Sequence, residues 1–214
     1  GAVLAKQEML KPYVYSAQAI AARSVEAVAL DALARLQSGA AATIAQHWLK
    51  EAPHMSAEQA ALTTLVHHQL PGADDALQAF YARWKHEPLV LDQWFATQAS
   101  APQAETRERV EALLVHSDFD ATVPNRVRAV IGQFANNNPV AFHDAEGRGY
   151  SLIAKQLLAI DARNPQLASR LAGAFGIWQK LDESRQAHAL REIDALLASD
   201  LSSDTRETLS RIRG

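Results

Sequence analysis

The stretch GYSLIAKQLLAIDARNPQLASR, residues 149–170, decides the fold class of this chain. Its first half repeats apolar residues three or four positions apart, the spacing of one face of an α-helix: Ile153, Leu157 and Ile160. Asn164 and Pro165 then pair a favoured N-cap residue with proline at the first helical position, which indicates that a second helix starts there. Because so few residues connect the two helices, we expect them to pack as an antiparallel hairpin.

The same pattern of helical stripes and short breaks extends along the whole chain. Ser56 and Gln59, for example, have capping-box spacing and are expected to start a helix. No clean sequence repeat identifies a named solenoid family. The pattern predicts about twelve helices, at residues 15–37, 40–52, 56–70, 73–86, 88–99, 104–115, 124–135, 139–144, 149–162, 165–180, 183–198 and 203–212.

The amino-acid composition agrees with a helical fold. Of the 214 residues, 42 are Ala and 25 are Leu, whereas Val, Ile and Thr together supply only 28. Ala and Leu lead the helix scale, while β-branched residues favour strands. The length suits one large domain or two small ones. We expect residues 1–14 to be a flanking segment or a remnant of cloning, and residues 15–214 to form the helical domain.

Composition also excludes several classes of protein. The chain has no cysteine, which excludes a disulfide framework, a thiolate zinc site and a cysteine nucleophile, and which fits a reducing compartment. The net charge of −3 provides no basic excess, so we expect no nucleic-acid partner. No apolar run approaches the length of a membrane span, so we expect no membrane partner either.

The polar motifs predict no catalytic or metal site. His86-Glu87 begins like a zincin motif, but Val90 stands where the second histidine is needed, and Pro88 interrupts the helix. His143-Asp144 is the best isolated pair, and we interpret it as a helix-end hydrogen bond. The Gly-Arg-Gly run at 147–149 has no strand before it, so it is expected to serve a loop that leads into a helix.

Arginines gather at the starts of two expected helices, where they oppose the helix dipole. Arg126 and Arg128, with Asn125, open one helix, and Arg170 lies in the first turns of the helix that begins after Asn164. Salt bridging or packing of the arginine stems would explain them. Alternatively, they form an electropositive wall that meets carboxylates or peptide carbonyls.

A long, ordered set of residues resembles bacterial aminopeptidase N, a zinc metallo-aminopeptidase of the gluzincin family. The resemblance runs from about residue 15 to the C-terminus and matches the C-terminal helical domain of that family. The segments that carry it are DALQAFYARWK at 75–85, EPLVLD at 87–92, WFATQA at 94–99, PNRVR at 124–128, Asn138-Pro139, Phe142-His143, GRGY at 147–150 and NPQ at 164–166, with Ala168, Ser169 and Arg170.

The resemblance implies an all-α fold of stacked antiparallel helical hairpins, an α-α superhelix of the HEAT or armadillo kind. It implies that the chain is a non-catalytic part of a cytoplasmic enzyme that removes N-terminal amino acids from peptides. The chain lacks the family's zinc-binding H-E-x-x-H helix, so no cofactor is expected in it, and zinc is expected in the parent's catalytic domain. Its partners would be that catalytic domain and peptides in the enclosed cavity.

The resemblance also gives the candidate residues roles. In the family, arginines that match Arg128 and Arg170 look toward the cavity, so these two are expected to contact the peptide or the catalytic domain. Arg126 belongs to the same segment, and Asn125 and Asn164 would fix the helix starts that aim the arginines. The alternative is an independent α-helical repeat scaffold that binds a protein or a peptide along a concave face.

Overall fold

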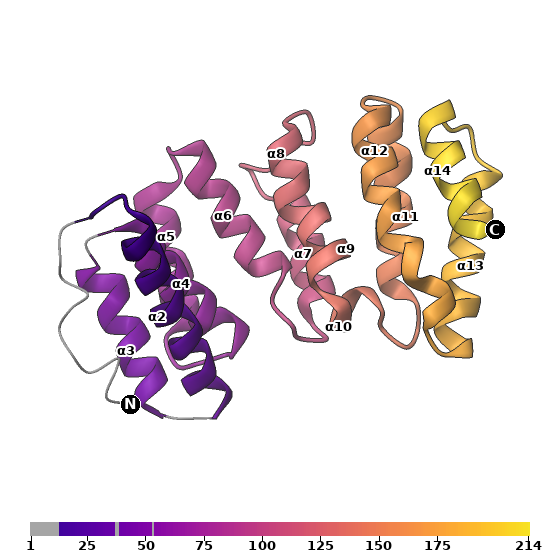
Figure 1. Ribbon diagram of the computed structural model, residues 1–214. Coiled ribbons are helices and arrows are strands. Elements are labelled where there is room, and N and C mark those ends of the chain that lie inside the picture. The colour runs from indigo at the N-terminus through magenta and orange to yellow at the C-terminus, as the bar shows by residue number, and fades with distance from the viewer. Residues whose placement is uncertain (1–12, 37–38, 53) are drawn as a thin grey trace. The chain divides into compact units, whose positions relative to one another are not determined.

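The computed structural model describes residues 13–36, 39–52 and 54–214, and this part of the chain is helical without a strand (Figure 1). The flanking segment expected at residues 1–14 lies almost entirely outside the described residues. The chain divides into two compact units, which we call unit 1, up to Thr97, and unit 2, from Gln98 onward. Each unit is described by itself.

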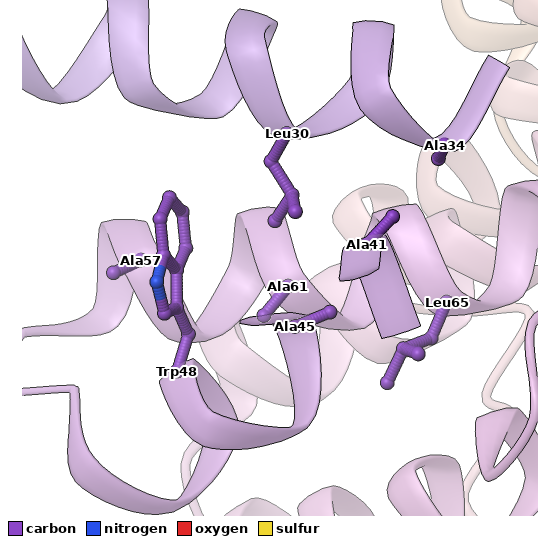
Figure 2. Packing of buried hydrophobic residues seen from close by; sticks show 8 residues of the cluster. All are labelled: Leu30, Ala34, Ala41, Ala45, Trp48, Ala57, Ala61 and Leu65. Carbon is purple, nitrogen blue, oxygen red and sulfur yellow. The ribbon is translucent and has the colours of Figure 1, made fainter. Parts of the chain in front are cut away.

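Unit 1 is a stack of helices in which α4 packs against three others. The helices are α2 (Ala17–Arg35), α3 (Gly39–Glu51), α4 (Met55–His67), α5 (Ala73–Trp84) and α6 (Pro88–Ala99), the last of which ends just past the unit boundary. α4 contacts α2, α3 and α5. The core around α4 consists largely of short side chains, as Figure 2 shows: Leu30, Ala34, Ala41, Ala45, Trp48, Ala57, Ala61 and Leu65. Short side chains allow helix backbones to approach closely.

Two helix starts in unit 1 are fixed by side-chain caps. The Ser16 hydroxyl accepts a hydrogen bond from the backbone N–H of Ala19 and starts α2. His54 Nδ1 accepts from the N–H of Ala57 at 3.2 Å and starts α4 one residue before Ser56. The expected Ser56 cap is therefore wrong, because the imidazole at position 54 satisfies the free N–H first.

Unit 2 contains more, and shorter, helical elements. They are α7 (Thr106–Leu114), α8 (Pro124–Val127), the π-helix η2 (Arg128–Gly132), α9 (Gln133–Asn137), α10 (Pro139–Phe142), α11 (Arg148–Asp161), α12 (Pro165–Ala172), the 3₁₀-helix η3 (Gly173–Lys180), α13 (Glu183–Leu197) and α14 (Ser203–Arg213). α8, η2 and α9 run on without a break, as do α12 and η3. Counted as continuous segments, the described residues hold twelve helices, which confirms the expected all-α class and number.

Aromatic rings and buried polar groups hold unit 2 together. Phe142 lies 6.2 Å from Phe134, 5.2 Å from Tyr150 and 5.7 Å from Phe175, measured between ring centroids. Asn138, which is fully buried, caps α10, and its amide donates to the carbonyls of Ala99 and Ala101. The core of unit 2 is thus built from large side chains and fully paired polar ones.

A second polar anchor joins α11 to the start of α14. The carboxylate of Asp161, at the end of α11, accepts from the Ser202 N–H at 2.7 Å and from the hydroxyls of Ser202 and Thr205 at 2.6 Å. Ser202 is the N-cap of α14, and its hydroxyl accepts from the Thr205 N–H. One carboxylate therefore satisfies the free donors at a helix start that is distant in sequence.

Candidate functional site

The first group of candidate residues lies where α8 passes into the π-helix η2. Arg128 is exposed, and its guanidinium donates to the Asn125 side-chain oxygen at 2.8 Å. Asn125 is not the helix cap, because α8 begins after Val123, which offers no side-chain acceptor. Asn125 instead restrains Arg128 one turn further along. A π-turn within a helix is rare and is often found at functional sites, and the sequence did not predict it.

Arg126 lies in a different environment from the exposed Arg128. It is buried, at 7% exposure, and its guanidinium donates to the backbone carbonyl of Asp118 in the preceding loop. The same loop holds Asp120, whose carboxylate accepts from the Thr122 hydroxyl and N–H. These bonds lower the pKa of Asp120 against the raising effect of burial, and the charges of Arg126 and Arg163 lower it further. The loop is therefore a region of mixed charge, not a purely positive one.

The second group lies at the start of α12. Asn164 caps this helix as expected, since its side-chain oxygen accepts from the Leu167 N–H at 3.1 Å. Arg170 is exposed and has no hydrogen-bond or ion-pair partner among the residues that the structure describes. Ser169, beside it, is bonded to Thr208 of α14 through the two hydroxyls at 2.7 Å. Arg170 is thus a free cation on a helix that is fixed at its start and on one side.

The structure places the helices that carry the two groups next to each other within unit 2. A Cβ placed on Gly132 of η2 would lie 3.5 Å from Leu171 of α12 and 3.6 Å from the Cβ of Arg128, so η2 and α12 approach each other at Gly132 and Leu171. A pocket of about 180 Å³ also separates the starts of α8 and α12, and its walls include Thr122, Pro124 and Asn164. Arg163, which also lines this pocket, is a cation that the sequence reasoning did not single out.

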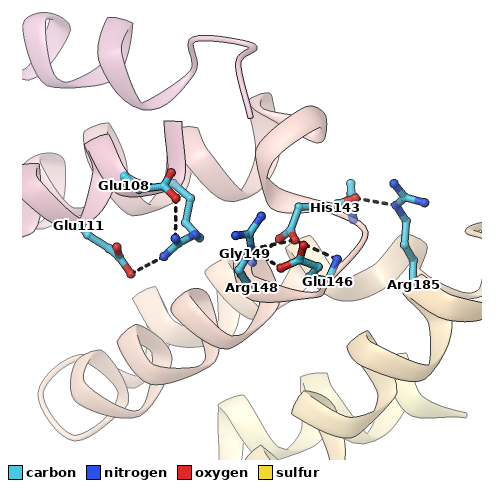
Figure 3. A network of polar contacts seen from close by, with 9 residues as sticks. Glu108, Glu111, His143, Glu146, Arg148, Gly149 and Arg185 are labelled. Atoms are coloured by element: carbon cyan, nitrogen blue, oxygen red, sulfur yellow. Dashed lines mark hydrogen bonds and ion pairs between the residues drawn. The ribbon is translucent and has the colours of Figure 1, made fainter. Parts of the chain in front are cut away.

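The His143-Asp144 pair is structural, as the sequence indicated. Asp144 accepts from the N–H groups of Glu146 and Gly149 at the start of α11, and Arg148 pairs with it and with Glu146 (Figure 3). Gly149 is required there, because a Cβ would lie 2.3 Å from the carbonyl oxygen of Phe142. The glycine run therefore serves a tight loop into a helix, which confirms the interpretation from sequence.

His143 itself makes a partly buried hydrogen bond. Its Nδ1 lies 2.9 Å from the Tyr150 hydroxyl. Its carbonyl accepts from Arg185 Nε at 2.6 Å, and this contact is drawn in Figure 3. Burial raises the pKa of Tyr150 to about 12, while burial and the charge of Arg185 lower the pKa of His143. Both groups are therefore neutral at physiological pH and hold α10 against α11.

The described part of the chain contains no set of side chains that could bind a metal ion. Within residues 13–36, 39–52 and 54–214, no three His, Asp or Glu side chains gather closely enough to hold a metal ion. The residues present therefore do not fit the zinc of a metallo-aminopeptidase. Over the same residues, no helix is long and apolar enough to cross a membrane.

Helices that pack against their neighbours in the chain, without a strand in the described residues, define a helical-repeat domain of the armadillo kind. The chain belongs to the family described as "Domain of unknown function (DUF3458_C) ARM repeats", whose model matches residues 2–214. This family description confirms the armadillo-like fold expected from the sequence resemblance.

The individual proteins that the chain resembles are consistent with this family assignment. The chain is 40% identical to Aminopeptidase N of Caulobacter vibrioides over 142 residues, which are 66% of this chain and 16% of that protein. It is 36% identical to Aminopeptidase N of Escherichia coli over 195 residues, covering 90% of this chain and 22% of that protein. The crystal structure of Legionella pneumophila aminopeptidase A in complex with aspartic acid matches with a TM-score of 0.83 and 32% identity.

These matches confirm the resemblance to the C-terminal helical domain of aminopeptidase N. The Legionella match covers 91% of this chain and 23% of that structure. The chain therefore spans about a quarter or less of the length of each relative.

Proposed function

We propose that this chain is the non-catalytic domain of a cytoplasmic, zinc-dependent aminopeptidase, and that it covers the active-site cavity and controls peptide access. The rest of the enzyme would hold the zinc and would remove N-terminal amino acids from peptides. The observation that carries the proposal is the match of 90% of the chain to 22% of the aminopeptidase N of Escherichia coli, together with the absence of a metal-ligand cluster in the described residues.

Arg128 and Arg170 are the residues proposed to contact the peptide or the catalytic domain. Both are exposed, and they lie on helices that touch through Gly132 and Leu171. Arg170 has its full hydrogen-bonding capacity available, whereas Arg128 is restrained by Asn125. A guanidinium can bind a carboxylate or a carbonyl with several donors at once, which suits it to the recognition of peptide ends and backbones.

Arg126, Asn125 and Asn164 would act as positioning residues. Arg126 ties α8 to the preceding loop through the Asp118 carbonyl, and Asn164 fixes the start of the helix that carries Arg170. Their proposed contribution is the geometry of the two exposed arginines and not a direct contact with substrate.

The test compares the hydrolysis of two substrates by the full-length enzyme that carries this domain. With Arg170→Ala, kcat/KM for a tetrapeptide is expected to fall about 10- to 100-fold, since a charge-assisted hydrogen bond contributes about 1.5–3 kcal/mol. A single-residue amide, too short to reach the domain, should keep its kcat/KM. Arg211→Ala, an exposed arginine on α14, is the matched control. Equal losses on both substrates, or no loss on either, would overturn the proposal.

A second test separates this proposal from an independent scaffold. The purified 214-residue chain with added zinc should release no N-terminal residues, and it should bind the catalytic portion of the same enzyme in a pull-down. Peptidase activity of the isolated chain would contradict the non-catalytic assignment. Capture of an unrelated protein without the catalytic portion would favour the scaffold.

A further inference from the structure

Unit 1 contains a groove of about 530 Å³ that has no part in the function proposed above. α3 contributes Leu49 and Lys50 to its walls, α5 contributes Asp75, Phe80 and Arg83, and α4 contributes Glu58. Its volume lies within the range of small-molecule sites, about 300–1,000 Å³. The groove is therefore large enough for a ligand of several heavy atoms.

The carboxylate of Glu58 is the unusual feature of this groove. The residue is only 6% exposed, and its Oε1 accepts from the Trp84 indole at 2.9 Å and from Arg83 Nη1 at 3.4 Å. Its other oxygen, Oε2, has no hydrogen-bond partner among the described residues. Because Glu58 lines the groove, this oxygen is open to an occupant of the groove and can accept a hydrogen bond from it.

A cation of the protein lies directly beside this carboxylate. Arg83 stacks its guanidinium 4.8 Å above the Trp84 ring and keeps a side chain that is 60% exposed, so most of its N–H donors remain available. Lys50, on α3, is 82% exposed, lies 3.9 Å from Glu51 Oε1 and adds a second cation to the groove. The Glu58 carboxylate and Arg83 Nη1 are 3.4 Å apart, so an acceptor for an ammonium group and donors for a carboxylate lie side by side, as the two charges of an α-amino acid require.

Part of the remaining wall of the groove is apolar, although Asp75 also lines it. Phe80 is buried, and Leu49 is half-buried. An apolar side chain placed against Phe80 and Leu49 would lose contact with water, which is favourable in proportion to the area covered.

We propose that this groove binds a free α-amino acid with an apolar side chain. The ammonium group of the ligand donates to Glu58 Oε2, Arg83 and Lys50 donate to its carboxylate, and its side chain lies against Leu49 and Phe80. Amino acids of this class are the kind of product that an aminopeptidase releases. The proposal uses only residues of unit 1 and does not depend on the role proposed for this chain in covering the active-site cavity.

The test uses the 214-residue chain and three probes in calorimetric titrations. L-leucine is expected to bind. N-acetyl-L-leucine, which lacks the ammonium, and L-leucinamide, which lacks the carboxylate, should each bind at least about tenfold more weakly, the loss expected when a charged hydrogen bond is removed. No binding of L-leucine, or equal binding of N-acetyl-L-leucine, would overturn the proposal.

Two variants assign the binding to this groove. Glu58→Gln keeps the size of the side chain and an acceptor for Trp84, and should weaken L-leucine binding about tenfold or more. Glu207→Gln, an exposed carboxylate on α14, is the matched control and should leave it unchanged. Circular dichroism checks folding. If the Glu58→Gln variant does not fold, the Arg83→Gln variant is measured in its place, because this exposed side chain can be replaced without disturbing the core. An affinity for L-leucine that is unchanged in Arg83→Gln would overturn the proposal.

Discussion

The core around α4 in unit 1 and the core of unit 2 are filled in different ways. Five of the eight core side chains around α4 in unit 1 are alanines, whereas Phe134, Phe142, Tyr150 and Phe175 meet at the centre of unit 2. Helices that pack through alanine gain stability from close approach and have no room for added atoms. Helices that pack around aromatic rings depend on large buried areas, which a truncation removes. The same helical pattern in sequence therefore produces two cores that should fail in opposite ways.

The buried polar groups of the units also differ. In unit 2, Asn138, at 0% exposure, and Asp161, at 5%, are each held by several hydrogen bonds. In unit 1, Glu58 is 6% exposed and is bonded through one of its two oxygens. Because buried polar groups stabilise only when they are fully paired, unit 2 should be the more specific of the two folds and the more sensitive to single polar changes.

The largest effect is expected from Phe142→Ala in unit 2. Phe142 is fully buried among three other rings, so the variant loses transfer energy and leaves a cavity, at a cost of about 3–5 kcal/mol in unfolding free energy. Chemical denaturation followed by circular dichroism measures it. Val140→Ala, on the same helix but 49% exposed, is the control and should cost much less. Similar losses for both variants would show that the ring cluster is not the core of this unit.

The next effect is expected from Asp161→Asn, and it should depend on pH. Burial raises the pKa of Asp161, but the hydrogen bonds from Ser202 and Thr205 outweigh it and hold the pKa below its ordinary value of 3.8. A carboxyl whose pKa is lower in the folded state stabilises the fold above its ordinary pKa, and this stabilisation is lost as the pH falls through the folded value. The variant should cost about 1.5–3 kcal/mol near neutral pH.

The matching measurement is the unfolding free energy of wild type and variant at neutral pH and well below pH 3.8. The difference between the two proteins should shrink in acid, because the wild-type carboxylate becomes protonated. Ser203→Ala, a change at an exposed hydroxyl beside the same anchor, should show no such dependence. A difference that stays constant with pH would mean that the charge of Asp161 is not what anchors α14.

The contrast between the units also shows what sequence alone can predict. The caps at Asn138 and Asn164 were predictable, because an N-cap and the proline after it act within one turn of the chain. The buried position of Arg126 was not predictable, because it depends on a hydrogen bond to the Asp118 carbonyl, in a loop whose path is set by packing. The expected single helix at 165–180 changes to a 3₁₀-helix at Gly173, where two glycines weaken the helical preference.

A smaller effect is expected from Ala45→Leu in unit 1. Ala45 is fully buried in the core around α4, so a larger side chain must push the helices apart, at a cost of about 1–3 kcal/mol. The control is Ala21→Leu on the exposed side of α2, which should be almost neutral. Thermal unfolding of both variants checks the prediction. If Ala45→Leu is accommodated without loss, unit 1 is not close-packed, and its contrast with unit 2 disappears.

The smallest effect is expected from Ser16→Ala, which removes the cap of α2. The Ser16 hydroxyl accepts from the Ala19 N–H at 3.2 Å, and the loss of such a cap costs about 0.5–2 kcal/mol, at the low end for an exposed site. Ser24→Ala on the same helix is the matched control, because its hydroxyl donates to the Ile20 carbonyl and caps nothing. It should be neutral or slightly stabilising, since alanine is the better helix former. If both serines cost the same, the start of α2 is held by packing and not by its cap, and unit 1 would then resemble unit 2 in depending on tertiary contacts at its helix ends.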